Sequence, residues 1–143
     1  MNPRDNSVNI ADVKLNQILK LMYQQYNKRH KTNAQISSYK FMPMSFVQEN
    51  HSFLTELINE QRALSHLDNY TDELVMNAIF NGMVKNNFVV SDSGGYHFSE
   101  MGYKQALKSS CKIKYWNTYH TRTFWGALIA ILSSILGWIS FGK

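Results

Sequence analysis

Apolar residues recur every three or four positions over most of this chain, a spacing that places them on one face of an α-helix. The pattern predicts helices over residues 9–26, 43–66 and 71–86, and a further helix that begins after Ser99. Asn50 interrupts the apolar stripe of the second range and indicates a break there. The first stripe is expected to pack in the core, with a dimerising helix outside the core as the alternative.

Two short β-prone segments follow the third helix. Residues 88–91 and 96–99 are rich in Phe, Val and Tyr, and the segment 92–95 between them contains two glycines. This arrangement predicts a β-hairpin. Ser99 is then expected to cap the next helix, where Gly102 permits close packing because it has no side chain.

Large apolar residues in these elements define the expected core. Leu57, Ile79, Phe88 and Phe98 are predicted to be buried together. The apolar stripes of the second and third helices also include Phe53, Leu64 and Leu74.

The last apolar stretch, residues 123–141, contains no Asp, Glu, Lys, Arg or His. A helix of this length extends about 28 Å, close to the ~30 Å hydrocarbon core of a bilayer. We therefore predict one membrane-spanning helix at the C-terminus, with a hydrophobic helix docked on a partner or on the domain's own core as the alternative. Aromatic and basic residues around the run are expected at the membrane interfaces. These are Trp116, Tyr119, Arg122, Trp125 and Trp138.

The distribution of basic residues beside this run predicts its orientation. Lys and Arg are frequent over residues 104–122, whereas Lys143 alone follows the run. The positive-inside rule then places the N-terminal part in the cytoplasm. The polar N-terminus has no signal-peptide pattern. The sequence thus predicts a tail-anchored, single-pass protein of the cell inner membrane, with the lipid bilayer as a partner.

Small residues recur at helical spacing inside the run and allow two helices to approach closely in lipid. This stripe predicts self-association into a homo-oligomer. The alternative is that it reflects only the usual composition of membrane helices. The stripe consists of Gly126, Ala130, Ser133, Ser134 and Gly137.

The chain has a net charge of +5, and this charge is distributed unevenly along the sequence. Residues 1–40 carry +5, residues 41–103 carry −6 and residues 104–143 carry +6. Charge and apolar content together divide the chain into four segments. They are an N-terminal helix with a basic loop (1–40), a folded domain (41–110), a basic and aromatic juxtamembrane segment (111–122) and the predicted span (123–141).

The order helix, helix, helix, hairpin, helix resembles that of winged helix-turn-helix domains of bacterial type. Residues 78–107, AIFNGMVKNNFVVSDSGGYHFSEMGYKQAL, resemble the third helix, the wing and the following helix of that family. In that family the wing typically closes on a Leu/Phe-Ser/Thr-Glu-x-Gly step. Phe98, Ser99, Glu100, Met101 and Gly102 match it here. The resemblance implies a mainly α, winged-helix-like fold with a small β-hairpin, to which the sequence adds one C-terminal transmembrane helix.

DNA-binding members of that family place the third helix in the major groove. Candidate contacts to nucleic acid or to lipid headgroups are Asn77, Asn81 and Lys85 on that helix, and Lys28, Arg29 and Lys31 on the basic loop. Phosphate neutralisation supplies most DNA affinity, so the −6 block and a wing tip without Lys or Arg disfavour nucleic acid. We therefore expect a module that binds an unknown protein partner. The alternatives are a membrane-tethered transcriptional regulator and a small membrane effector, such as a toxin or phage-defence component.

No group of residues has the spacing of a catalytic or metal site. The sequence has five histidines and one cysteine, Cys111, without an HExxH or paired-cysteine motif. One thiol without a His/Asn partner does not make a nucleophile. We predict no catalytic residue, no metal ligand and no cofactor, and we do not expect an enzyme.

Overall fold

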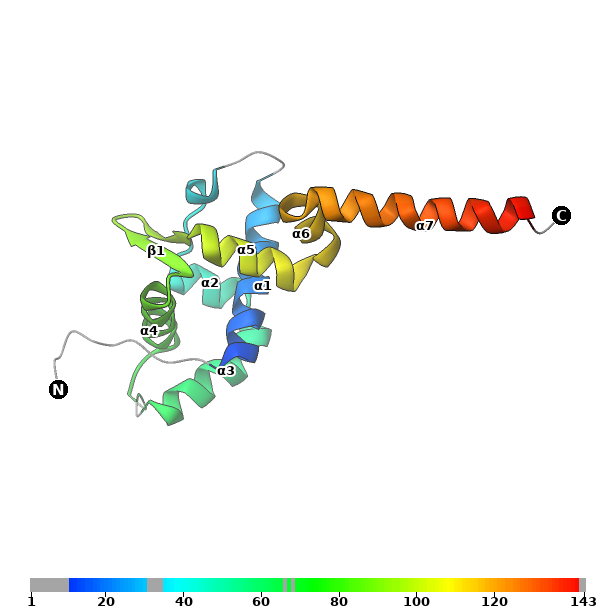
Figure 1. Ribbon diagram of the computed structural model, residues 1–143. Helices are drawn as coiled ribbons and strands as arrows, with labels where there is room; N and C mark the ends of the chain where they lie inside the picture. Colours follow the sequence, from blue (N-terminus) through cyan, green and yellow to red (C-terminus); the bar gives the residue numbers. More distant parts are fainter. Residues whose placement is uncertain (1–10, 31–34, 66, 68, 142–143) are drawn as a thin grey trace. The chain divides into compact units, whose positions relative to one another are not determined.

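The computed structural model describes residues 11–30, 35–65, 67 and 69–141, except for the side chains of Val13 and of residues 135–141. The chain forms two compact units, Met1–Ser110 (unit 1) and Cys111–Lys143 (unit 2). The described part is mainly helical with one two-stranded antiparallel hairpin (Figure 1). Unit 1 contains α1 (Asp12–Arg29), the 3-10 turn η1 (Ile36–Ser38), α2 (Pro43–Glu49), α3 (His51–Leu64), α4 (Asp72–Lys85), β1 (Val89–Asp92), β2 (Gly95–Phe98) and α5 (Glu100–Ser110), and unit 2 contains α6 (Lys112–Tyr119) and α7 (Thr121–Phe141).

The core of unit 1 forms where α1 packs along α5 and where α4 packs on α2 and α3. Ile18, Leu19 and Met22 of α1 are fully buried, which confirms the predicted core position of the first apolar stripe. The helix runs on to Arg29, beyond the predicted end at residue 26. Part of the segment expected to be a basic loop is therefore helical.

Aromatic rings connect the hairpin to the helices. The ring centroids of Phe41 and Phe98 are 5.3 Å apart, and those of Phe80 and Tyr96 are 4.8 Å apart. Phe46 of α2 reaches Phe80 of α4 at 5.5 Å. Such pairs add stability beyond the apolar area that they bury. Backbone hydrogen bonds in both directions between Phe41 and Tyr96 hold the segment before α2 against β2.

The helix boundaries follow local capping chemistry. Pro43 occupies the first turn of α2, where its missing N–H costs nothing. Asn50 ends α2 and donates from Nδ2 to the carbonyl oxygen of Phe46 at 2.9 Å. The Thr71 hydroxyl caps α4 by accepting from the backbone N–H of Leu74 at 3.4 Å. The predicted break at Asn50 and the predicted start of the third helix are confirmed.

The hairpin pairs Val89 with Phe98 and Asp92 with Gly95. The predicted hairpin is confirmed, with each strand displaced by one residue toward the turn. Asp92 Oδ1 accepts from the Gly94 N–H at 2.9 Å and stabilises that turn. Gly95 has a φ of 118°, a conformation that glycine adopts without steric cost.

Three backbone and side-chain hydrogen bonds join α4, the hairpin and α5, and we call this group the Ser99–Gly102 clasp. Ser99 Oγ accepts from the Gly102 N–H at 2.9 Å and donates to the carbonyl oxygen of Asn87. The Ser99 N–H donates to the carbonyl oxygen of Phe88 at 3.1 Å. A Cβ at Gly102 would lie 1.7 Å from that Phe88 oxygen. The predicted cap at Ser99 and the close packing at Gly102 are confirmed.

The predicted core is largely confirmed. Leu57, Ile79 and Phe98 are buried, with 6%, 0% and 2% of their surface exposed. Phe88 is only half-buried, so its prediction was wrong in degree. It follows the end of α4 and contributes its backbone carbonyl to the clasp, which leaves the ring at the margin of the core.

Three large residues of the apolar stripes are exposed, contrary to expectation. Phe53, Leu64 and Leu74 expose 73%, 67% and 47% of their surface. Phe53 precedes buried Leu54, and successive helical residues point about 100° apart. Leu64 is the last residue of α3, and Leu74 lies in the first turn of α4. Each therefore misses the packed side of its helix or lies near its end.

The structure contradicts the predicted membrane span. Among the described residues, no helix combines the length and the apolar content required to cross a membrane. The fold class with a transmembrane helix, the tail anchor and the inner-membrane location were therefore wrong.

The clasp predicts a specific sensitivity to a single methyl group. Gly102→Ala should destabilise unit 1 by about 1–3 kcal/mol, because the added Cβ meets a backbone oxygen that cannot rotate away. Urea unfolding of the full chain, followed by circular dichroism, measures this. Gly94→Ala is the control, since its Cβ would lie 3.5 Å from the nearest atom. Equal unfolding free energies for the two variants would show that the clasp is not close-packed in solution.

Candidate interaction surfaces

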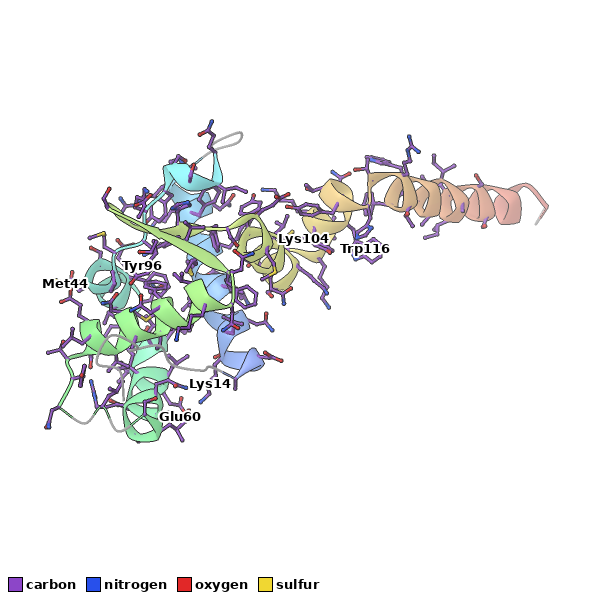
Figure 2. All side chains as sticks on the ribbon, turned by 60° about the vertical axis from the view of Figure 1, so that its left-hand side comes forward. Lys14, Met44, Glu60, Tyr96, Lys104 and Trp116 are labelled. Atoms are coloured by element: carbon purple, nitrogen blue, oxygen red, sulfur yellow. The ribbon has the colours of Figure 1, made fainter. Side chains whose placement is uncertain are left out.

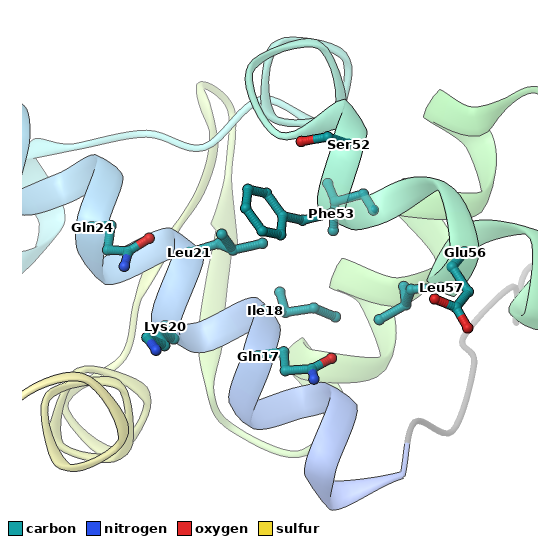
Figure 3. Close-up of a pocket in the computed structure, with 10 residues that line it drawn as sticks. Gln17, Ile18, Lys20, Leu21, Gln24, Ser52, Phe53, Glu56 and Leu57 are labelled. Atoms are coloured by element: carbon teal, nitrogen blue, oxygen red, sulfur yellow. The ribbon is translucent and has the colours of Figure 1, made fainter.

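A groove of about 530 Å³ lies between α1 and α3. Ile18 of α1 and Leu57 of α3 are buried residues that line it. The ring of Phe53 extends from α3 toward Leu21 on α1 (Figure 3). Beyond one end of the groove, Lys14 of α1 forms an ion pair with Glu60 of α3 (Figure 2). Apolar atoms of both helices thus line a cavity that is open to solvent.

Charged and polar side chains border this groove. Lys20 lies on the α1 wall and Glu56 on the α3 wall, and both are exposed. Neither has an ion-pair partner among the residues that the structure describes. Gln17 and Gln24 add neutral polar groups on α1. The groove therefore combines an apolar interior with one charge of each sign that no described residue pairs.

Asn77 and Asn81, the predicted base contacts on the third helix, lie together against the hairpin. The Tyr96 hydroxyl contacts Asn77 Oδ1 and lies 2.8 Å from Asn81 Oδ1. A hydroxyl has one proton, so Tyr96 donates to one carboxamide oxygen at a time. The Tyr96 hydroxyl is protonated at neutral pH, and burial raises its pKa further. Both asparagines are half-buried, whereas Lys85 at the end of α4 is exposed.

An ion pair joins the tip of the hairpin to the segment before α2. Lys40 forms an ion pair with Asp92. His97 Nδ1 lies 3.5 Å from Asp92 Oδ2 and has no hydrogen-bond partner within the described residues. Burial, and then the positive charge of Lys40, lower the pKa of His97. At neutral pH the imidazole is thus neutral, and the carboxylate of Asp92 is compensated by Lys40.

The basic residues at the end of α1 form an ordinary surface cluster. Arg29 Nη2 lies 3.2 Å from Glu49 Oε1, and the guanidinium lies 5.9 Å from the centre of the Tyr39 ring. Gln25 donates to the other oxygen of Glu49 at 2.6 Å. Lys28 is exposed, and Lys31 lies outside the described residues. Arg29 therefore contributes little net positive charge for a phosphate.

Unit 2 carries the residues that the sequence assigned to membrane interfaces. Trp116 and Trp125 expose 45% and 49% of their surface, Arg122 is exposed and Tyr119 is half-buried. Trp138 lies outside the described side chains.

The stripe of small residues is exposed to solvent along the described part of α7. Gly126, Ala130, Ser133 and Ser134 are exposed, and a Cβ at Gly126 would meet no atom within 4 Å. Ser134 Oγ donates to the carbonyl oxygen of Ala130 at 2.9 Å, which satisfies the hydroxyl within the helix. Gly137 lies outside the described side chains.

Sequence spacing missed the groove and the contact between Tyr96 and the two asparagines. Phe53 fits the apolar period of its helix, so periodicity alone placed it inside. Asn77 and Asn81 are four residues apart and share a helix face, which was a detectable signal for a joint contact. The identity of that contact required the register of the hairpin.

Searches against models of protein families, curated proteins and solved structures found no match for this chain. Among the described residues, no three His, Cys, Asp or Glu side chains gather as a metal site.

Removing the Tyr96 hydroxyl should weaken the attachment of the hairpin to α4. We expect Tyr96→Phe to cost about 0.5–2 kcal/mol, because a half-buried carboxamide oxygen loses its donor. Thermal or urea unfolding at neutral pH measures the loss. Tyr70→Phe is the matched control, since Tyr70 is exposed and no described group bonds its hydroxyl. Equal losses for the two variants would contradict the contact.

His97 predicts a loss of stability in mild acid. Its pKa is lower in the folded chain than the ordinary 6.5, so the unfolded chain binds the proton at higher pH. The contribution of neutral His97 to the free energy of unfolding is therefore present above about pH 6.5. It is lost as the pH falls through the pKa of His97 in the folded chain. We expect the free energy of unfolding to decrease between about pH 7 and pH 5, and to decrease less in His97→Gln. Identical pH dependence in both chains would contradict this prediction.

Proposed function

We propose that this chain is a non-catalytic interaction protein whose copies associate through α7. One observation carries the proposal: large apolar side chains on α7 are exposed. Trp125, Ile129 and Leu132 expose 49%, 60% and 53% of their surface. Soluble monomers rarely expose contiguous apolar patches of this kind, and such patches mark association surfaces.

The positions of these side chains favour a second copy of α7 as the partner. At 100° per residue, Trp125, Leu128 and Leu132 lie on one side of the helix with spacings of three and four. This spacing forms the seam of paired helices. Burial of large side chains drives association in water, so the seam lies on this side, opposite the small-residue stripe expected from the sequence. Gly126 and Ala130 then face away from the seam.

Charge supports an antiparallel pair. Residues 111–143 contain no Asp or Glu, while Arg122 lies in the first turn of α7. A parallel pair would place the two Arg122 side chains together. An antiparallel pair places each near the C-terminal end of the other helix, where the macrodipole favours a cation by about 0.3–1 kcal/mol.

A protein role for unit 1 is favoured over a nucleic-acid role. The carboxamide oxygens of Asn77 and Asn81 engage Tyr96, and Asp92 occupies the hairpin tip with Lys40 as its partner. Residues 41–103 carry a net charge of −6, which repels a phosphate backbone. In this proposal α7 gathers copies of unit 1, and unit 1 provides the contacts to proteins.

Substitution within the seam tests the association. Leu132→Asn should weaken self-association of the full chain by about tenfold or more, because each copy loses a buried leucine. Ala130→Asn introduces the same side chain on the other side of α7 and should leave association unchanged. Sedimentation over a range of concentrations measures both. A monomeric parent chain, or equal effects of the two variants, would contradict the proposed seam.

Disulfide trapping tests the orientation. In a Cys111→Ser chain, a cysteine replacing Leu132 near the middle of α7 should form an intermolecular disulfide. A cysteine replacing Thr121 at the start of α7 should not, because antiparallel helices place the two starts about 30 Å apart. Efficient trapping through residue 121 would instead indicate a parallel pair.

A further inference from the structure

The α1/α3 groove contains both a cavity and a side chain shaped to fill one. Phe53 projects from the α3 wall with 73% of its surface exposed, beside a groove of about 530 Å³. The two features share one patch of unit 1 (Figure 3). A two-fold interface uses the same patch on both copies, so it requires a projection and its receptor side by side. This patch meets that requirement.

We propose that two copies of unit 1 pair through this groove, with Phe53 of each copy inserted into the groove of the other. Each ring would turn away from Leu21 of its own copy, toward which it extends in the structure, and would rest between Leu21 and the floor formed by Ile18 and Leu57 of the partner copy. Aromatic residues, phenylalanine included, are enriched in protein interfaces, and the residues that dominate the binding energy fill well-packed pockets near the centre. This contact is separate from α7 and goes beyond the function proposed above.

The charges beside the groove identify a second copy as the occupant. Lys20 and Glu56 lie on opposite walls, and neither has an ion-pair partner among the described residues. A two-fold axis through the groove brings Lys20 of one copy to Glu56 of the other, and the reverse pair forms by symmetry. An unrelated helix would need to supply both an acid and a base at matching positions. The patch is thus complementary to itself in shape and in charge.

Photo-cross-linking in the full chain tests the location. A benzoyl derivative of phenylalanine at position 53 retains the projecting ring and labels what it touches. Isotope-labelled and unlabelled copies are mixed, so that mass spectrometry separates links between copies from links within one. We expect links between copies that map to residues 17–24. The same derivative at Leu64, which is exposed on α3 outside the groove, should give none there.

Charge exchange tests the pairing. Lys20→Glu or Glu56→Lys alone should lower the inter-copy yield by about fivefold or more, because each interface then contains two like-charge contacts. An equimolar mixture of the two variants should restore it, since both contacts between positions 20 and 56 of a mixed pair then join opposite charges. Lys28→Glu, on the same helix but outside the groove, should have no effect. Thermal unfolding of each variant confirms that unit 1 remains folded.

Two results would overturn the inference. One is the absence of inter-copy cross-links from position 53 to residues 17–24. The other is a yield of inter-copy cross-links that does not depend on the charges of residues 20 and 56. Failure of α7 association gives a different pattern: Leu132→Asn would leave the parent's oligomeric state unchanged, while links from position 53 to residues 17–24 would persist. The groove contact and the α7 contact are therefore tested separately.

Discussion

The backbone contact between Phe88 and Gly102 determines how the second half of unit 1 is built. The carbonyl oxygen of Phe88 accepts from the Ser99 N–H at 3.1 Å and occupies the space that a side chain at residue 102 would need. The start of α5 is thereby fixed against the end of α4, and the hairpin must close between them. Because α1 packs along α5, the clasp also sets the position of the α1 wall of the groove.

The hairpin of this protein chiefly makes packing and hydrogen-bond contacts within unit 1. Its inward residues reach α4 and the segment before α2: Phe98 packs on Phe41, Phe80 stacks with Tyr96, and the Tyr96 hydroxyl contacts two asparagines of α4. Its tip is neutralised by Lys40. In a DNA-binding winged helix the wing and the third helix must present free donors to a phosphate-rich surface. Here the Tyr96 hydroxyl of the hairpin is engaged by Asn77 and Asn81 of α4, and Asp92 at the hairpin tip is paired with Lys40.

Local chemistry made much of this fold predictable. The capping threonine at residue 71, the break at Asn50 and the turn at Gly94 and Gly95 each depend on a few neighbouring residues, and sequence patterns detect such features. The exposure of Phe53 depends on where α1 lies beside α3, and no local pattern encodes that. The contact between Asn77, Asn81 and Tyr96 depends likewise on the pairing register of the hairpin, which places Tyr96 opposite Ser91. Apolar content led to a wrong prediction for the C-terminal helix. An apolar composition indicates that side chains tend to be buried, but it does not indicate whether lipid or protein buries them.

The division of the chain into two compact units has a consequence for stoichiometry. The two proposed contacts are each self-complementary and use different residues of the chain. A molecule with two such surfaces has a valence of two and can link neighbours alternately, groove to groove and α7 to α7. Alternation of two two-fold contacts produces an open filament unless its geometry returns to the starting copy. Because the two contacts form independently, the mean length of such a polymer would increase gradually with concentration, and the weaker contact would limit it.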